Sequence, residues 1–157
     1  MAAIGQVLRA GIAAVVLALL ALTPAWAGGD WNDGQVQWQP YAEGLQLAKK
    51  TKKPICLVFY TDWCPHCNNY SGVFHDPKVV AKSNQFVMIR LNSDENKELG
   101  QQYAGDGQYI PRTFFLSPEG KLEPAIALAR DRFKYFYDEK NPASLLDGMD
   151  EALKKLR

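Results

Sequence analysis

The sequence predicts an α/β domain built on one central mixed sheet with helices on both faces. Two apolar segments rich in β-formers, residues 55–60 and 86–91, are separated by two helical segments, and a strand pair and a final helix follow. Strand, helix and strand in this order give a right-handed parallel crossover. The order βαβ and then ββα therefore indicates a single sheet, and the sequence has no internal repeat and no second domain.

The predicted fold begins with a helix and a buried strand. Pro40 fits the first turn of a helix, and Tyr41, Leu45 and Ala48 then recur at helical spacing. Residues 55–60 are continuously apolar, as expected of a central strand that is covered on both faces.

Two helices and a second strand complete the crossover. Residues 65–70 and 76–83 have helical patterns, and Asp76 with Pro77 gives the second helix an N-cap and a first-turn proline. Residues 86–91 repeat the buried-strand pattern of residues 55–60.

The second half is predicted to hold a short helix, a hairpin and a long final helix. A helix over residues 95–103 precedes strands at 113–116 and 121–126, whose connection has proline second and glycine fourth, as in a type I turn. Asn141 can cap the final helix, and Pro142 fits its first turn. One face of that helix is apolar: Leu145, Leu146, Met149, Leu153 and Leu156.

Residues 1–27 have the pattern of a secretory signal peptide. Arg9 is the one charge in this segment, residues 11–22 carry no polar side chain, and a small-x-small sequence ends at Ala27. An apolar run this short is below the roughly 20 residues that cross a bilayer, so an uncleaved anchor is the weaker alternative. The expected organisation is a signal peptide (1–27), an irregular lead-in (28–40) and one folded domain (41–157).

The charge balance excludes one class of function. Lys and Arg number 18 and Asp and Glu 17, and without Arg9 the balance is 17 to 17. A nucleic-acid-binding protein usually has a basic excess, so we expect no nucleic-acid partner. Three cysteines are too few for a disulfide-stapled scaffold, although an exported space permits disulfides. Cys56, inside an apolar strand, is interpreted as a small core hydrophobe, with a regulatory or metal-binding role as the alternative.

The other two cysteines form a Cys64-Pro65-His66-Cys67 motif that follows the first buried strand and opens a helix. Two intervening residues let both sulfurs meet across one helical turn. Cys64 is then at a helix N-terminus, where free N–H groups and the helix dipole stabilise a thiolate, the nucleophile of disulfide exchange. Pro65 fixes the helix start, and His66 adds a positive charge or a donor. Both favour the reduced form and make the disulfide more oxidising.

Other uses of this cysteine spacing are weaker. Attachment of a c-type haem is excluded because Asn68, not histidine, follows the second cysteine. A structural zinc site needs four ligands, and His66 and His75 are the only histidines. Copper handling by Cys64, Cys67 and His66, and a purely structural disulfide, stay open.

Trp63 before the cysteine pair, together with Ile110-Pro111 before a later strand, resembles the thioredoxin superfamily. This resemblance implies the thioredoxin fold, with a cis Pro111 beside the cysteines, and a substrate backbone held by Trp63, Ile110 and Pro111. It implies a thiol–disulfide oxidoreductase in which Cys64 exchanges with the substrate and Cys67 resolves the intermediate. It requires no cofactor beyond the redox-active Cys64–Cys67 disulfide, and no metal.

Residues 86–89, 107–112 and 134–137 look like the small thioredoxin-like proteins of the endoplasmic reticulum, which include the anterior-gradient proteins, and the similarity spans about 45–153. The Pro-His dipeptide is instead similar to that of the periplasmic disulfide-forming enzyme. Val58 stands where many thioredoxins carry a buried acid, which leaves the proton acceptor for the second cysteine open. The chain ends Lys-Lys-Leu-Arg without a reticulum retrieval signal, which favours a bacterial periplasm.

We therefore expect a monomeric oxidoreductase whose substrates are proteins with thiols or disulfides. A second, membrane-bound redox partner would reset the cysteine pair. The Pro-His dipeptide favours the oxidising direction, although reduction and isomerisation stay open. Two alternatives are a client-binding, chaperone-like module without turnover and a copper-handling thiol protein.

Overall fold

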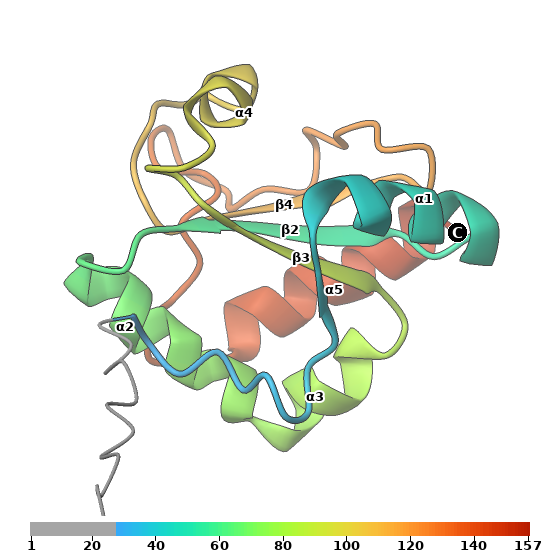
Figure 1. Cartoon of the computed structure of the whole chain (residues 1–157), viewed down its shortest axis with the longest axis horizontal. Coiled ribbons are helices and arrows are strands. Elements are labelled where there is room, and N and C mark those ends of the chain that lie inside the picture. Colours follow the sequence, from blue (N-terminus) through green and yellow to red (C-terminus); the bar gives the residue numbers. More distant parts are fainter. Residues whose placement is uncertain (1–27) are drawn as a thin grey trace, which may run out of the picture.

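The computed structural model describes residues 28–157, so the predicted signal peptide lies outside the described residues. A mixed sheet forms the centre of the domain, and helices cover both of its faces (Figure 1). This is the predicted fold class. None of the helices within residues 28–157 has the length and apolar character that crossing a membrane requires.

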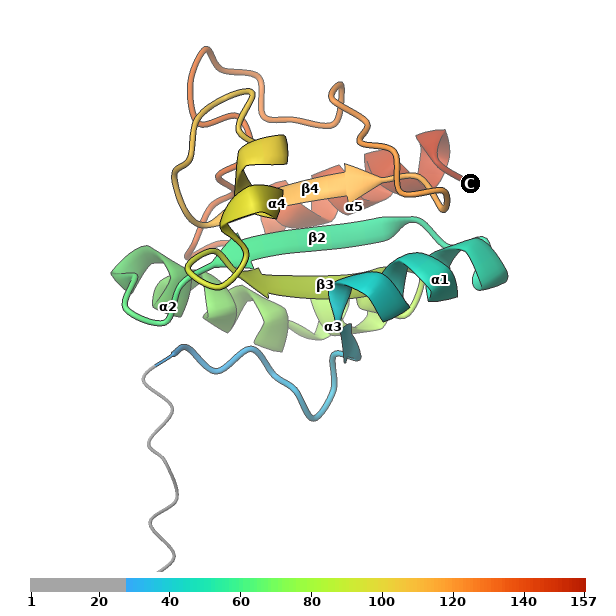
Figure 2. The ribbon, with the colours of Figure 1, turned by 45° about the horizontal axis from the view of Figure 1, so that its top comes forward.

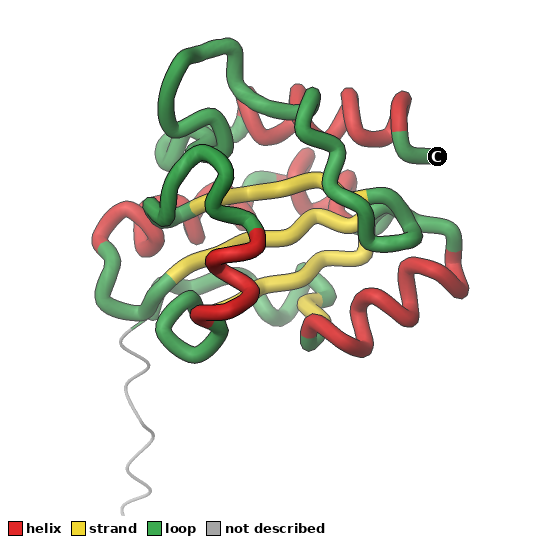
Figure 3. The backbone as a smooth tube through the Cα atoms, turned by 90° about the horizontal axis from the view of Figure 1, so that it is seen from above, coloured by secondary structure: helices red, strands yellow, loops and turns green. Residues whose placement is uncertain are grey.

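The sheet has four strands in the order β1-β3-β2-β4 (Figure 3). The central strand β2 (Ile55–Tyr60) pairs in parallel with β3 (Val87–Asn92) and antiparallel with β4 (Arg112–Leu116). The edge strand β1 (Trp38–Gln39) pairs in parallel with β3. The predicted parallel crossover from residues 55–60 to residues 86–91 is confirmed.

The helices form two layers (Figure 2). One layer contains α1 (Tyr41–Thr51) and α4 (Lys97–Gln102). The opposite layer contains α2 (Pro65–Ser71), α3 (Pro77–Ser83) and α5 (Ala143–Lys155). A 3-10 helix, η1 (Gly72–His75), joins α2 to α3.

Side-chain alternation along β2 builds both halves of the core. Ile55, Leu57 and Phe59 belong to the cluster under α1 and α4, whereas Cys56 and Val58 belong to the cluster under α2, α3 and α5. All five side chains are fully buried. Each fully buried large apolar side chain contributes about 1.5–3 kcal/mol, which explains why this segment is apolar without interruption.

Local capping explains where two helices begin. Asp76 Oδ1 accepts hydrogen bonds from the N–H groups of Lys78 at 2.8 Å and Val79 at 3.3 Å, so its predicted N-cap role is confirmed. Asn141 Oδ1 accepts the N–H of Ala143 at 2.9 Å, although the N-cap of α5 is Pro142. Each predicted helix is present, and its ends move by one or two residues, as is usual when helix ends fray.

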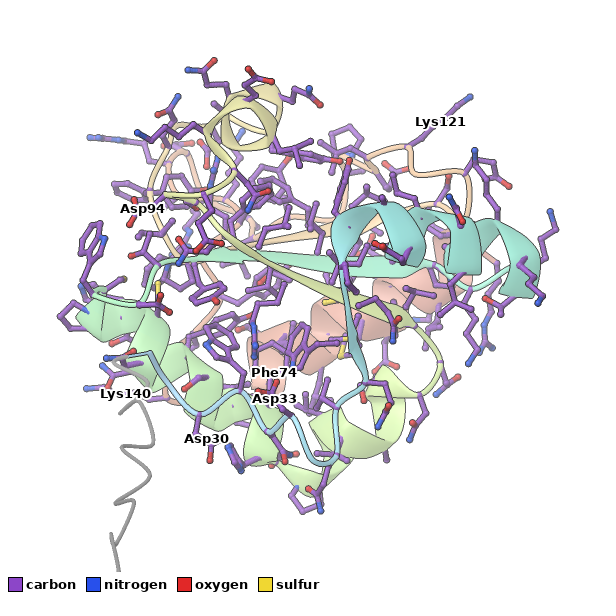
Figure 4. All side chains as sticks on the ribbon, in the orientation of Figure 1. Asp30, Asp33, Phe74, Asp94, Lys121 and Lys140 are labelled. Atoms are coloured by element: carbon purple, nitrogen blue, oxygen red, sulfur yellow. The ribbon has the colours of Figure 1, made fainter. Side chains whose placement is uncertain are left out.

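The lead-in, residues 28–40, is irregular apart from the two-residue strand β1, and it packs against the core. Trp31 is buried and packs edge-on against Trp38, which belongs to β1. The Arg90 guanidinium lies over both indole rings and pairs with Asp33 at 3.0 Å. Figure 4 shows the labelled Asp33 near Phe74, whose ring also packs against Trp31. A strand of two residues has no readable alternation, so the sequence pattern could not predict it.

The predicted hairpin after β4 is wrong beyond its turn. Gly120 donates its N–H to the Ser117 carbonyl at 2.8 Å and adopts a φ of 82°, which forms the turn. Residues 121–126 form no strand, and one isolated bridge joins Leu122 to β4. Pro124 has no N–H to donate to a ladder, which explains why the pairing stops.

Candidate active site

The cysteine pair is at the point where the chain leaves β2 and enters α2. Cys64 is the N-cap residue of α2, and its Sγ accepts the Cys67 N–H at 3.2 Å. Pro65 is the first residue of the helix, as predicted. Both thiols are free, Cys67 is fully buried and Cys64 is 3% exposed. A thiolate at Cys64 would therefore accept a hydrogen bond from the backbone N–H of Cys67.

The cysteine pair faces the segment that precedes β4. The Ile110–Pro111 peptide bond is cis, and the Ile110 carbonyl oxygen lies 4.0 Å from Cys64 Sγ. Trp63 is 69% exposed, and its Nε1 donates to Asp94 Oδ2 at 2.7 Å. The structure thus brings together residues that lie 46 positions apart in the sequence.

A cavity of about 320 Å³ opens between these two segments. Trp63 and Ile110 line it together with Asp94 and Arg112. Figure 4 labels Asp94 at the end of the sheet where α2 begins. Neither cysteine lines the cavity itself, whose nearest lining residues are Trp63, the residue before Cys64, and Ile110, whose carbonyl oxygen faces Cys64 Sγ.

His66 is held by a residue that the sequence did not suggest. Its Nδ1 lies 2.7 Å from Glu139 Oε2, and Asn69 Nδ2 donates to Glu139 Oε1 at 3.0 Å. The edge of the His66 ring meets Phe136, with ring centroids 5.7 Å apart. Glu139 lies 73 positions beyond His66, and Asp94 lies 31 positions beyond Trp63, so no local spacing signals either contact.

Cys56, interpreted from the sequence as a core residue, is buried, and so are three residues of the second half of the chain. Cys56 is fully buried in β2, and burial raises the pKa of its thiol, which keeps it protonated and inert. Tyr135 and Tyr137 are also buried, whereas Phe136 between them is half-buried. Arg112 is 2% exposed and has a structural role that the sequence left undefined.

Residues 28–157 contain no group of three or more histidine, cysteine, aspartate or glutamate side chains that could hold a metal ion. His66, one member of the copper set considered above, directs its Nδ1 to Glu139.

The pKa of Cys67 predicts how the reactivity of its thiol depends on pH. Burial raises this pKa, and the hydrogen bond with Cys64 raises it further. A thiol attacks a mixed disulfide only as its thiolate, whose fraction rises about tenfold per pH unit below the pKa. We expect stopped-flow resolution of a Cys64 mixed disulfide to accelerate by that factor per unit between about pH 6 and 8. A rate that is flat across this range would contradict the prediction.

Residues 37–118 match the family model described as thioredoxin-like. The chain belongs to the thioredoxin-like family. The human anterior gradient protein 2 homolog is 32% identical over 128 residues, which are 81% of this chain and 71% of that protein. Human anterior gradient protein 3 is 27% identical over 129 residues, 81% of this chain and 76% of that protein. The predicted resemblance to the anterior-gradient branch is therefore confirmed.

Two solved structures are similar to this thioredoxin-like chain. A thioredoxin from Thermus thermophilus superimposes with a TM-score of 0.60 and 25% identity, and the match covers 77% of this chain and 89% of that one. A protein described as DsbH oxidoreductase gives a TM-score of 0.58 and 25% identity, over 87% and 93% of the two chains. Both comparisons agree with the predicted thioredoxin fold.

Proposed function

We propose that this protein is an exported thiol–disulfide oxidoreductase that acts on protein cysteines through Cys64 and Cys67. The observation that carries the proposal is the position of Cys64 Sγ, 3.2 Å from the Cys67 N–H and 4.0 Å from the Ile110 carbonyl oxygen. Trp63 stands exposed beside it. Membership in the thioredoxin-like family and similarity to an oxidoreductase structure support the same reaction class.

In the oxidising direction, a substrate thiolate attacks Cys64 of the Cys64–Cys67 disulfide. The bond between the two cysteines breaks, a mixed disulfide forms on Cys64, and Cys67 leaves as a thiolate that takes up a proton. A second substrate thiolate then attacks the substrate sulfur of the mixed disulfide, which releases an oxidised product and leaves Cys64 reduced. In the reducing direction, the Cys64 thiolate attacks a substrate disulfide and Cys67 displaces the substrate.

The remaining predicted roles follow from this reaction. Trp63, Ile110 and Pro111 hold the substrate backbone against the sulfur, and Pro65 and His66 tune the stability of the reduced form. The reaction needs no metal and no cofactor besides the cysteine pair. A membrane-bound redox partner resets the pair, and we infer that the protein acts in the periplasm as a monomer.

Turnover of a protein disulfide tests the proposal. We expect the domain to reduce insulin with a small dithiol as electron donor, and Cys64→Ser to fall to the uncatalysed rate. Cys56→Ala, which removes a buried thiol from β2, is the matched control and should keep its activity. Equal rates for the wild type and Cys64→Ser would overturn the proposal. Substrate binding without turnover would instead indicate the chaperone-like alternative.

Trp63 offers a test of the substrate-binding surface. We expect Trp63→Ala to raise the KM for a protein substrate about tenfold, because exposed aromatic side chains dominate many binding surfaces. Its 69% exposure means that the free energy of unfolding should change by less than about 0.5 kcal/mol. Leu47→Ala removes another exposed apolar side chain, on α1, and serves as the control. Steady-state kinetics with an unchanged KM for Trp63→Ala would remove this residue from the binding surface.

A further inference from the structure

Glu139 lies in the loop before α5, the helix that shares a layer with α2. Asp138 donates its N–H to Ser144 Oγ at 3.0 Å, and its Oδ1 accepts the N–H groups of Lys140 at 2.8 Å and Asn141 at 3.1 Å. The side chain of Glu139 is 15% exposed. These contacts fix the backbone on both sides of Glu139, so its carboxylate is positioned before any substrate binds.

Both carboxylate oxygens of Glu139 point to α2. Oε2 contacts His66, inside the cysteine motif, at 2.7 Å, and Oε1 contacts Asn69, one helical turn later, at 3.0 Å. Phe136 packs against the ring of His66 from the same loop. The imidazole, 62% exposed to solvent, is therefore in contact with one carboxylate and one aromatic ring.

We propose that Glu139 is a positioning residue that clamps His66 and makes the Cys64–Cys67 disulfide less oxidising than the Pro-His dipeptide alone would make it. This inference rests on the proposed function and deepens it. Only the reduced pair can carry a thiolate, so nearby charge acts on the reduced form. Any positive charge on His66 would stabilise a thiolate, and the negative charge of Glu139 Oε2, 2.7 Å from His66 Nδ1, opposes that stabilisation.

A second effect of the carboxylate has the same sign. Burial is the largest cause that raises the pKa of the Cys67 thiol, the hydrogen bond and the charge of Cys64 follow, and the charge of Glu139 is a smaller cause with the same sign. Raising that pKa disfavours a thiolate and hence stabilises the disulfide relative to the reduced form. The effect of Glu139 through His66 can be separated from its direct effect on Cys67, because only the first requires the His66 side chain.

The test is the equilibrium of the protein disulfide with two glutathione thiols, which yields the protein dithiol and oxidised glutathione. We expect Glu139→Gln, which keeps the shape of the side chain, to raise this equilibrium constant about threefold to tenfold, or about 15–30 mV. Glu151→Gln on α5 removes the same charge from a pair with Lys155, away from the cysteine motif, and should leave the constant unchanged.

Removing His66 then isolates the clamp. In a His66→Ala background, Glu139→Gln should change the equilibrium constant by less than half as much on the logarithmic scale, as expected of two coupled residues. The inference would be overturned if Glu139→Gln left the equilibrium constant unchanged, or if Glu151→Gln changed it as much as Glu139→Gln does. It would also be overturned if Glu139→Gln had its full effect in the His66→Ala background. The equilibrium with glutathione needs no protein substrate. If Glu139→Gln shifted the equilibrium constant but the wild type did not reduce insulin, the result would count against the proposed function alone.

Discussion

Replacing Cys67 with alanine is expected to turn the protein into a trap for its substrates. Cys64 keeps its donor in this variant, because the hydrogen bond at 3.2 Å comes from the backbone N–H of residue 67. A substrate disulfide is then opened by Cys64, and no second thiol displaces the product. We expect turnover to fall to the uncatalysed rate while a mixed disulfide accumulates to nearly one equivalent.

Cys64→Ala is the complementary variant and should form no mixed disulfide. Cys67 is fully buried, so a substrate cannot reach it directly. Non-reducing electrophoresis followed by mass spectrometry of the trapped complex distinguishes the two variants. Trapping by Cys64→Ala, or by both variants equally, would show that the assignment of the attacking sulfur is wrong.

Replacing Arg112 with methionine is expected to cause a large loss of stability. Its Nη1 donates to the carbonyl oxygens of Tyr103 at 3.0 Å and Gly107 at 2.9 Å, and its Nη2 donates to that of Gly100 at 3.3 Å. The side chain is 2% exposed, and no carboxylate within residues 28–157 pairs with it. Arg112 therefore ties α4 and the loop after it to β4.

Methionine fills similar space but leaves these carbonyl groups without their donor. We expect the free energy of unfolding in urea to fall by about 2–4 kcal/mol, because unpaired buried polar groups cost about 1–3 kcal/mol each. Arg132→Met, an exposed arginine in the loop before α5, should change it by less than about 0.5 kcal/mol. A loss below about 1 kcal/mol for Arg112→Met would mean that water replaces the guanidinium at this site.

The strands and the position of the cysteine pair could be predicted because they depend on local pattern. β2 is buried on both faces, and this requires an unbroken apolar run, which residues 55–60 provide. The start of α2 is marked by Pro65, and Asp76 marks the start of α3. The prediction of a second hairpin strand at residues 121–126 was wrong because Pro124 interrupts a segment that otherwise has strand propensity.

The groups around the cysteines could be predicted only in part. Trp63 and Ile110 were identified because the resemblance to the thioredoxin superfamily assigns roles to those positions. Glu139 and Asp94 carry no such signal, since each meets its partner only through the packing of distant loops. Arg112 follows Pro111 in a strand pattern where a buried cation is unexpected, and its acceptors are carbonyl groups that sequence does not reveal.

The most direct test of the central claim is a count of free thiols in the wild-type domain after equilibration in glutathione mixtures and alkylation. Cys64 and Cys67 should lose their thiols together as the mixture becomes oxidising, so the count should pass from three to one. The remaining thiol, Cys56, should be alkylated only after denaturation, because it is fully buried. Three free thiols at every glutathione ratio, or a disulfide that includes Cys56, would contradict the redox role of the Cys64–Cys67 pair.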